Sequence, residues 1–374
     1  MRIAVPKEIK SGEKRVALVP DIISKLTKAG LEVVIESGAG VNAQAADQDF
    51  KAAGADVKSG DVLTGADVVL SVQPLTPAQM KSLKKGAITI SFLSPTGSID
   101  SIDAAVAAGV TAFSLEMVPR ISRAQSMDAL TSQALCAGYR ASLVAAELSP
   151  KFFPLLMTAA GTVTPAKVVV LGAGVAGLQA IATAKRLGAV VSAYDVRPAS
   201  ADEVKSMGAK FITLELEALE GAGGYAREMT EERAAKQREL LTPYIAEADV
   251  LITTAAVPGR TAPRLVTAQM AAQMKPGSVI VDLAAETGGN VEGSVAGEVI
   301  TTAAGVTMWG GKDVPSQLPY HASMLFSRNV VNLLMLMSKS VDGKPTGELV
   351  PDFSDEIIDT AALTHAGAKR EKGK

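Results

Sequence analysis

Short apolar runs alternate with helical patterns along the first third of the chain. Five of these runs have the length and composition of strands: Arg2–Val5, Glu32–Glu36, Asp67–Val72, Ala87–Phe92 and Val110–Leu115. Helical patterns lie between them, for example at Asp21–Ala29 and Pro77–Leu83. Strand–helix alternation of this kind predicts a parallel sheet with helices on both faces.

The same alternation returns further along the chain. Strand-like runs begin at Val168 and continue at Lys210–Leu214, Val250–Thr253, Ser278–Asp282 and Val306–Trp309. Two long helical patterns, Ser126–Ser149 and Ala322–Ser340, flank this region, and the second has no strand companions. We therefore expect an α/β fold of two domains joined by long helices, the first of them discontinuous: residues 1–130 plus 315–374, and residues 138–312. The last dozen residues are basic and polar, and we expect them to be frayed.

Composition narrows the function classes. The chain has 374 residues, 48% of them hydrophobic, and a formal net charge of −2, which argues against nucleic-acid binding. Cys136 is the only cysteine, so the sequence predicts neither a disulfide nor a cysteine metal site. No apolar stretch is long enough to cross a bilayer, and the N-terminus does not read as a signal peptide. We expect a cytoplasmic chain with no membrane span and no metal.

The most informative stretch joins two apolar runs through a glycine-rich turn. Gly172-x-Gly174-x-x-Gly177 follows the first run, and Asp195 ends the second. Gly172 suits the tight turn, Gly174 the close approach of a pyrophosphate, and Gly177 close packing of helix on strand. Free N–H groups at the helix N-terminus attract phosphates, and Asp195 stands where a carboxylate accepts hydrogen bonds from a ribose. The order predicts dinucleotide binding on one of two Rossmann-like, doubly wound domains; the first domain has no such turn.

Two further segments carry candidate chemistry. Gly221–Arg233 is a glycine-rich, charged insertion, either a lid over bound nucleotide or a plain solvated loop. Pro119–Asp128 places Arg120, Arg123, Gln125 and Asp128 after a strand, where α/β sheets bind ligands. The alternative for that segment is a polar helix N-terminus. Arg15 suits a carboxylate or phosphate clamp, although surface solvation is the ordinary role of such a residue.

A family resemblance rests on three strings: PRISRAQSMDALTSQ from Pro119, GGYAREM from Gly223, and MTAAGTVTPAKVVVLGAGVAGLQAIATAKRLGA from Met157. With them, the region Met1–Ser340 resembles the soluble NAD(H)-binding alpha subunit (domain I) of proton-translocating NAD(P) transhydrogenase, in the alanine dehydrogenase/transhydrogenase superfamily. The resemblance implies a homodimer. It also implies an NADP(H)-binding beta subunit and a membrane proton-channel subunit as partners, which would hold the chain at the cytoplasmic face of the inner membrane.

The resemblance also implies site residues, by position. The residues matching the family's nicotinamide loop, to which we assign the catalytic role, are Arg120, Gln125, Asp128 and Thr131. The cofactor-binding set is Ile121, Ser122, Arg123, Gly172, Ala173, Gly174, Val175, Gly177, Asp195, Val196, Arg197, Gly224, Tyr225, Met229 and Ala256. Within it, Ala173–Val175 would meet the pyrophosphate and Asp195–Arg197 the adenosine ribose. The mobile lid, around residues 218–233, would contribute Gly224, Tyr225 and Met229, and Ala256 would border the adenine.

Alanine dehydrogenase is the competing interpretation, because its N-terminus also resembles MRIAVPKEIKSGEKRVALVP. Members of that group carry a substrate-binding Lys where this chain has Ser71-Val72-Gln73-Pro74, and a catalytic His where it has Phe92-Leu93-Ser94-Pro95. Their later catalytic Asp corresponds to Glu286. We read Val72 and Ser94 as evidence against oxo-acid chemistry. A third interpretation, a catalytically silent NAD sensor, is disfavoured by the intact loop from Pro119.

The resemblance implies direct hydride transfer between two nicotinamide rings, a reaction that needs orientation rather than an acid–base pair. It also implies that NAD(H) binds on this chain and NADP(H) on the partner. The negative charge of Asp195 favours NAD over NADP, although Arg197 could receive a 2′-phosphate.

Overall fold

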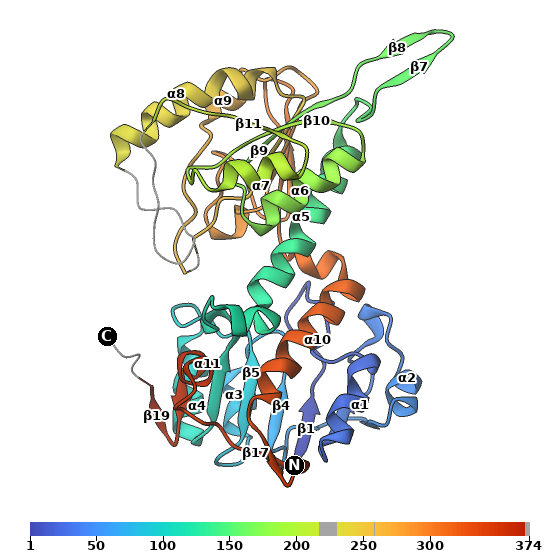
Figure 1. The fold of residues 1–374 in the computed structure, drawn as a ribbon, viewed down its shortest axis with the longest axis vertical. Coiled ribbons are helices and arrows are strands. Elements are labelled where there is room, and N and C mark those ends of the chain that lie inside the picture. Colours follow the sequence, from blue (N-terminus) through green and yellow to red (C-terminus); the bar gives the residue numbers. More distant parts are fainter. Residues whose placement is uncertain (217–229, 258, 371–374) are drawn as a thin grey trace. The chain divides into compact units, whose positions relative to one another are not determined.

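The computed structural model describes residues 1–216, 230–257 and 259–370, arranged in two compact units (Figure 1). Unit 1 comprises Met1–Gln133 and Pro315–Lys374, and unit 2 comprises Ala134–Val314. Unit 1 is therefore built from two separate stretches of the chain. The chain passes between the units twice, at Gln133–Ala134 and at Val314–Pro315.

Unit 1 is built on a six-stranded parallel sheet. Its strands are β1 (Arg2–Val5), β2 (Glu32–Glu36), β3 (Asp56–Lys58), β4 (Val68–Leu70), β5 (Ile88–Ser91) and β6 (Thr111–Ser114), in the order β3-β2-β1-β4-β5-β6. The intervening helices are α1 (Pro20–Lys28), α2 (Asp47–Ala52), α3 (Pro77–Lys81) and α4 (Ile99–Ala108). This is the strand order of a Rossmann sheet, and its strands are parallel, as the strand–helix alternation predicted.

The chain returns to unit 1 through α10 (Pro319–Met335), whose Phe326, Val330 and Leu334 are fully buried in the core. The predicted helix to Ser340 is too long. After Met335 the chain forms a hairpin of β16 (Ser338–Val341) and β17 (Lys344–Leu349), so the segment does have strands.

The expectation of a frayed C-terminus is wrong for most of the tail. After α11 (Glu356–Ala361), β18 (Thr364–His365) and β19 (Ala368–Lys369) form a second hairpin. It lies against β6: the Leu363 N–H donates to the Ala112 carbonyl at 2.8 Å. The His365 ring also packs on Phe353, with 4.6 Å between ring centroids.

Unit 2 carries the second parallel sheet. Its strands are β9 (Lys167–Leu171), β10 (Val190–Tyr194), β11 (Lys210–Phe211), β12 (Val250–Thr253), β13 (Val279–Asp282), β14 (Val299–Thr301) and β15 (Thr307–Gly310), in the order β11-β10-β9-β12-β13-β15-β14. Only β14, at the edge, is antiparallel. The helices are α6 (Val175–Arg186), α7 (Ser200–Ser206), α8 (Glu231–Glu247) and α9 (Ala268–Ala271).

The long helix α5 spans Ala129–Leu148 and begins three residues later than predicted. The preceding residues, Ser122–Met127, form a 3₁₀ helix instead. Asp128 stands at the junction, and its carboxylate accepts the Thr131 N–H at 2.9 Å. An aspartate in this position caps the first turn of a helix, which explains where α5 starts.

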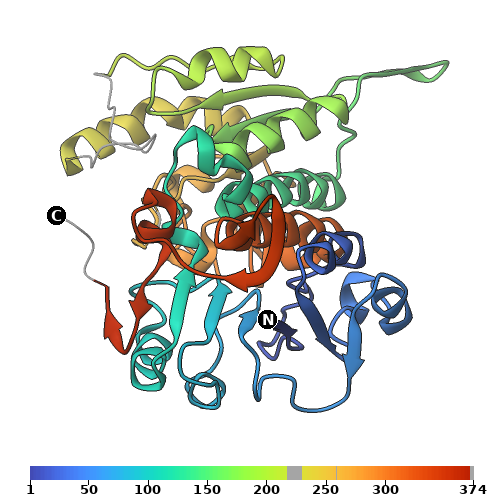
Figure 2. The same cartoon turned by 60° about the horizontal axis from the view of Figure 1, so that its bottom comes forward.

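After α5, a hairpin of β7 (Leu156–Thr158) and β8 (Gly161–Val163) projects away from the rest of unit 2 (Figures 1 and 2). It exposes apolar side chains: Leu155, Leu156 and Val163 are 54%, 39% and 37% exposed, and Met157 is 78% exposed.

Among residues 1–216, 230–257 and 259–370, no helix is long and apolar enough to cross a membrane. Within those same ranges, no cluster of three or more His, Cys, Asp or Glu residues has a metal-binding arrangement.

Candidate nucleotide-binding site

The glycine-rich turn of unit 2 joins β9 to α6, and each end of the turn is sterically crowded. Gly172 has φ +98°, and a Cβ there would stand 2.6 Å from the Thr254 hydroxyl oxygen. A Cβ at Gly177 would lie 1.9 Å from the Gly172 carbonyl oxygen. The fold itself therefore requires glycine at both positions, whether or not a nucleotide binds.

Gly174, between them, has different surroundings. It is the N-cap of α6 with φ −76°, and a Cβ there would meet no atom within 4 Å. The first N–H groups of a helix have no partners within the helix and carry its positive dipole end. The turn therefore presents an open helix N-terminus of the kind that binds a pyrophosphate, with Ala173 and Val175 on either side of Gly174.

Asp195 directly follows β10, and its carboxylate is largely buried, with 8% of the side chain exposed. One oxygen accepts the Ala173 N–H at 2.7 Å, which ties the residue to the glycine turn. Arg197 donates its Nε to Oδ1 at 2.8 Å and its Nη2 to Oδ2 at 2.9 Å. Burial alone would raise the pKa of Asp195, but these hydrogen bonds outweigh it and lower the pKa. The carboxylate thus stays ionised beside the turn.

The Asp195–Arg197 ion pair weakens the repulsion of a 2′-phosphate that the charge of Asp195 alone would give. Because Arg197 forms a two-bonded ion pair with Asp195, much of the negative charge next to the turn is neutralised within the chain. The guanidinium is also held by the carboxylate rather than extended toward solvent. Val196 lies between the two and packs against the core cluster that contains Tyr194.

The far side of the turn is closed by the segment after β12. The Thr254 hydroxyl donates to the Gly172 carbonyl at 3.0 Å, and Ala256, two residues on, is exposed. The residues predicted for the lid, Gly224, Tyr225 and Met229, lie outside the described residues. The described region resumes at Thr230, which caps α8 by accepting the Arg233 N–H.

In unit 1, the loop from Pro119 to Thr131 is held from several sides. Both Asp128 oxygens face Thr131, one accepting its N–H and the other its hydroxyl at 2.6 Å. Arg123 forms a two-bonded ion pair with Asp355, at 2.6 and 2.9 Å. Asn329 of α10 donates to the Ser126 carbonyl at 3.0 Å. The loop therefore has a fixed conformation.

The predicted residues of this loop differ in exposure. Arg120, Ser122, Arg123 and Gln125 are exposed, and Ile121, Asp128 and Thr131 are half-buried. Asp128 is not a loose surface charge, because Thr131 donates one hydrogen bond to each of its oxygens, and each oxygen can still accept a further bond. These hydrogen bonds connect Asp128 and Thr131, two of the residues to which the family resemblance gives the catalytic role.

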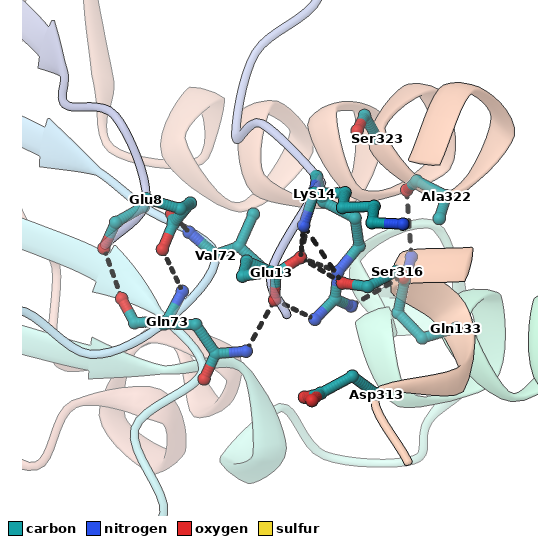
Figure 3. A network of polar contacts seen from close by, with 12 residues as sticks. Glu8, Glu13, Lys14, Val72, Gln73, Gln133, Asp313, Ser316, Ala322 and Ser323 are labelled. Atoms are coloured by element: carbon teal, nitrogen blue, oxygen red, sulfur yellow. Dashed lines mark hydrogen bonds and ion pairs between the residues drawn. The ribbon is translucent and has the colours of Figure 1, made fainter. Parts of the chain in front are cut away.

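Unit 1 also contains a buried polar network that sequence reasoning missed (Figure 3). Arg15, 7% exposed, bonds Glu13 twice, with Nη2–Oε2 at 2.6 Å and Nε–Oε1 at 2.8 Å. Arg15 also donates to Gln133, while Gln73 donates to Glu13 at 2.7 Å and the Ser316 hydroxyl donates to Glu13. Arg15 is thus a buried, internally paired residue rather than a solvated clamp. Arg15 holds the pKa of Glu13 down to about 2 against the effect of burial.

Glu8 extends this network at the end of β1. Its carboxylate accepts the Val72 N–H at 2.5 Å and the Gln73 N–H at 3.3 Å (Figure 3). Burial raises the pKa of Glu8 to about 7, and the nearby Glu13 carboxylate adds to the rise. β1 and β4 are the middle pair of the sheet, equivalent to β9 and β12 in unit 2. A carboxylate therefore stands in unit 1 where unit 2 has its glycine turn.

The positions used to argue against alanine dehydrogenase have defined surroundings. Val72 is fully buried in the apolar core, and Gln73 is the residue whose side chain reaches the Glu13–Arg15 pair. Within Ser71–Pro74, Gln73 is therefore the residue whose side chain takes part in the buried polar network. Ser94 caps a turn by accepting the Gly97 N–H at 3.1 Å, and Glu286 accepts the Asp313 N–H at 2.9 Å.

Comparison with protein-family models places both units in one family. Residues 4–137 match the model "Alanine dehydrogenase/PNT, N-terminal domain", and residues 141–372 match "Alanine dehydrogenase/PNT, C-terminal domain". The chain belongs to the alanine dehydrogenase/PNT family. The family resemblance stated from the sequence is confirmed, and with it the α/β fold of two Rossmann-like units.

Within this family, the chain is similar to transhydrogenase subunits over nearly its whole length. It is 47% identical to the first part of NAD(P) transhydrogenase subunit alpha in Rhodospirillum rubrum, covering 98% of this chain and 97% of that protein. It is 42% identical to NAD(P) transhydrogenase subunit alpha of Haemophilus influenzae, covering 98% and 71%. Alanine dehydrogenase of Mycobacterium tuberculosis is 34% identical, covering 79% and 75%.

Among solved structures, too, the similarity to a transhydrogenase is greater than the similarity to an alanine dehydrogenase. The transhydrogenase of Sinorhizobium meliloti superposes with a TM-score of 0.89 at 44% identity, covering 99% of this chain and 100% of that one. An L-alanine dehydrogenase superposes with a TM-score of 0.78 at 28% identity, covering 99% and 96%. Both sequence and fold are thus more similar to these transhydrogenases than to these alanine dehydrogenases.

Proposed function

We propose that this chain is the NAD(H)-binding subunit of a proton-translocating NAD(P) transhydrogenase. It would transfer hydride directly between NAD(H), bound on unit 2, and NADP(H), bound on a partner subunit. The observation that carries the proposal is the glycine turn: Gly174 faces open space at the N-terminus of α6, and Asp195 is tied to the same turn through Ala173. The similarity to transhydrogenase subunits over 98% of the chain supports this reaction over others that use a dinucleotide.

The reaction requires little acid–base chemistry from the chain. NADH supplies the hydride, and no proton moves at the reacting carbons. The chain's task is to orient the ring so that donor and acceptor carbons approach to ~3–3.5 Å. A loop that is rigid before the nucleotide binds suits this task, because little ordering remains to be done at the reaction.

We assign ring orientation to the loop of unit 1. Arg120 and Asp128 would fix the carboxamide, with Asp128 itself held by Thr131. Gln125, which is exposed, would reach toward the partner's nucleotide. Ile121, Ser122 and Arg123 would complete the loop around the ring.

Asp128→Asn tests this assignment. It keeps the shape of the side chain and removes the charge, so the maximal rate of hydride transfer should fall while binding of ADP-ribose, which lacks the nicotinamide, stays unchanged. If Asp128→Asn left both the transfer rate and the affinity for NADH unchanged, Asp128 would not orient the ring. Asp103→Asn, at an exposed ion pair with Lys369 in the same unit, is the matched control.

Proton movement would be the task of a membrane subunit, to which this chain would bind at the cytoplasmic face through the NADP(H)-binding beta subunit. We also propose that the chain is a homodimer. The exposed apolar hairpin β7–β8 supports this, because an isolated two-stranded hairpin is marginal in water and gains stability from a partner surface. Met157→Asp should shift the chain from dimer to monomer in sedimentation; an unchanged dimer would exclude the hairpin from the interface.

A further inference from the structure

Asn290 stands apart from every residue assigned so far. It lies in unit 2 just after the 3₁₀ turn Ala285–Thr287, and it is fully buried. Its side-chain nitrogen donates two hydrogen bonds, to the Ala255 and Pro263 carbonyls, both at 2.8 Å. These two carbonyls bracket the segment that follows β12. One side chain thus joins the two ends of that segment.

The backbone of the same residue strengthens the connection. The Asn290 carbonyl accepts the Leu265 N–H at 2.9 Å and the Val266 N–H at 3.0 Å. Its side-chain oxygen has no hydrogen-bond partner within the described ranges. The buried side chain therefore acts through its amide nitrogen, as a double donor to two backbone carbonyls.

The residue that follows Asn290 is anchored by Asp282 at the end of β13. Asp282 is fully buried; it accepts the Thr253 hydroxyl and the Ala284 N–H, each at 3.0 Å, and the Val291 N–H at 3.1 Å. These bonds connect β12, β13 and the turn that carries Asn290. A residue anchored in this way can fix the position of another segment.

The segment that Asn290 holds is in direct contact with the glycine turn. Thr254, next to Ala255, donates to the Gly172 carbonyl, and the Ala255 nitrogen would be 3.1 Å from a Cβ at Gly172. Because the Thr254 hydroxyl is bonded to the Gly172 carbonyl, a displacement of the neighbouring Ala255 would be passed on to the glycine turn. Ala256, the next residue, is the one that we expect to border the adenine.

We propose that Asn290 is a positioning residue for the adenosine half of NAD(H): it fixes Ala255 and Pro263 beside the glycine turn and so sets the width of the adenosine site. This rests on the proposed function, because it assumes that the nucleotide lies along this turn. The residue touches no reacting atom, so it acts on affinity and leaves the hydride-transfer step at saturation unchanged.

The test compares Asn290→Ala and Asn290→Asp with the unchanged chain. Asn290→Asp has nearly the same shape but puts a carboxylate oxygen against two carbonyl oxygens. Both variants should raise the dissociation constants for NADH and for ADP-ribose by about tenfold, because the loss of two buried hydrogen bonds lets the adenosine site shift. The rate of transfer at saturating NADH, with an NADP-binding partner domain added, should stay within twofold.

Ser278→Ala is the matched control. Ser278 is buried at the amino end of the same strand pair and donates one bond to the Ala248 carbonyl at 3.2 Å. It should lower the thermal midpoint without changing either dissociation constant. If the Asn290 variants lower only the midpoint, or weaken NADH and not ADP-ribose, the positioning role is wrong. If the unchanged chain fails to bind NADH, the proposed function falls as well.

Discussion

Arg15 and Glu13 form a buried ion pair that reaches both stretches where the chain passes between its two units. Arg15 donates to Gln133, the last residue of unit 1 before the first passage, at 2.9 Å. The Ser316 hydroxyl, just after the second passage, donates to Glu13. The pair therefore fastens both connecting segments to the sheet of unit 1.

Removing one partner of this pair should be costly. Glu13→Ala leaves the Arg15 guanidinium buried without its carboxylate, and we expect a loss of about 3–5 kcal/mol in the free energy of unfolding. The double variant Glu13→Ala/Arg15→Met should lose less than Glu13→Ala alone, because no uncompensated charge remains. Urea unfolding measures both. If Glu13→Ala were as stable as the unchanged chain, Glu13 and Arg15 would not form a buried ion pair. Asp103→Ala, which removes an exposed ion pair with Lys369, is the control.

Glu8 should make stability depend on pH near neutrality. Because the pKa of Glu8 in the folded chain is about 7, above its ordinary value of 4.5, its protonated form favours the folded state. This contribution is complete below pH 4.5 and is lost as the pH rises through about 7. Two charged groups face Glu8: the Glu13 carboxylate raises the pKa of Glu8, and the Arg15 guanidinium lowers it.

The measurement is the free energy of unfolding of the unchanged chain minus that of Glu8→Gln, at several pH values. This difference should become less favourable to the unchanged chain between about pH 5 and pH 8. Glu32→Gln, at the exposed start of β2, is the matched control for loss of a carboxylate. A difference that is flat with pH would mean that Glu8 titrates normally.

Asp195 and Arg197 should control both affinity and the choice of nucleotide. Asp195→Ala removes a charged acceptor and releases Arg197, so the affinity for NADH should fall about tenfold or more. The preference for NADH over NADPH should shrink at the same time, because the freed guanidinium can meet a 2′-phosphate. Titration with both nucleotides tests this. Asp202→Ala, whose side chain is 92% exposed on α7, should change neither, and an unchanged preference in Asp195→Ala would contradict the assignment.

Gly177 and Gly174 of the turn should respond differently to substitution by alanine. Gly177→Ala would place a Cβ 1.9 Å from the Gly172 carbonyl oxygen, so it should destabilise unit 2 by about 1–3 kcal/mol or more. Gly174→Ala meets no atom of the chain and has an ordinary φ of −76°, so its stability should change little. It should nevertheless weaken NADH binding by crowding the phosphates. Thermal unfolding and NADH titration distinguish the two, and equal effects on stability would refute the distinction.

The repeating pattern of strand and helix was sufficient to predict both parallel sheets, and the glycine fingerprint predicted the turn at Gly172. The hairpins were missed although their signals are local. Asp342 and Gly343 have φ +51° and +73°, and Ala366 and Gly367 have +49° and +82°. Two successive residues of positive φ, with glycine second, make the tight turn that joins β16 to β17 and β18 to β19. An Asp-Gly pair such as Asp342-Gly343 predicts a tight turn of this kind. Because the turn joins two strands, the helix before it ends at Met335 and does not reach Ser340.

The buried network around Glu13 could not be read from the sequence. Its members are far apart along the chain: Ser316 is 303 positions from Glu13, and Gln133 is 118 positions from Arg15. Only tertiary packing brings such residues together. The fingerprint at Gly172, by contrast, works within one strand, one turn and one helix, so local spacing was enough to find it.

Hydride transfer itself tests the central claim most directly. Purified chain with NADH and NADP⁺ would be assayed alone, with an NADP-binding domain of a transhydrogenase added, and with pyruvate plus ammonium in place of NADP⁺. We predict transfer only when the NADP-binding domain is present, and none to pyruvate and ammonium. Oxidation of NADH by pyruvate and ammonium without a partner would show that the chain is an alanine dehydrogenase instead.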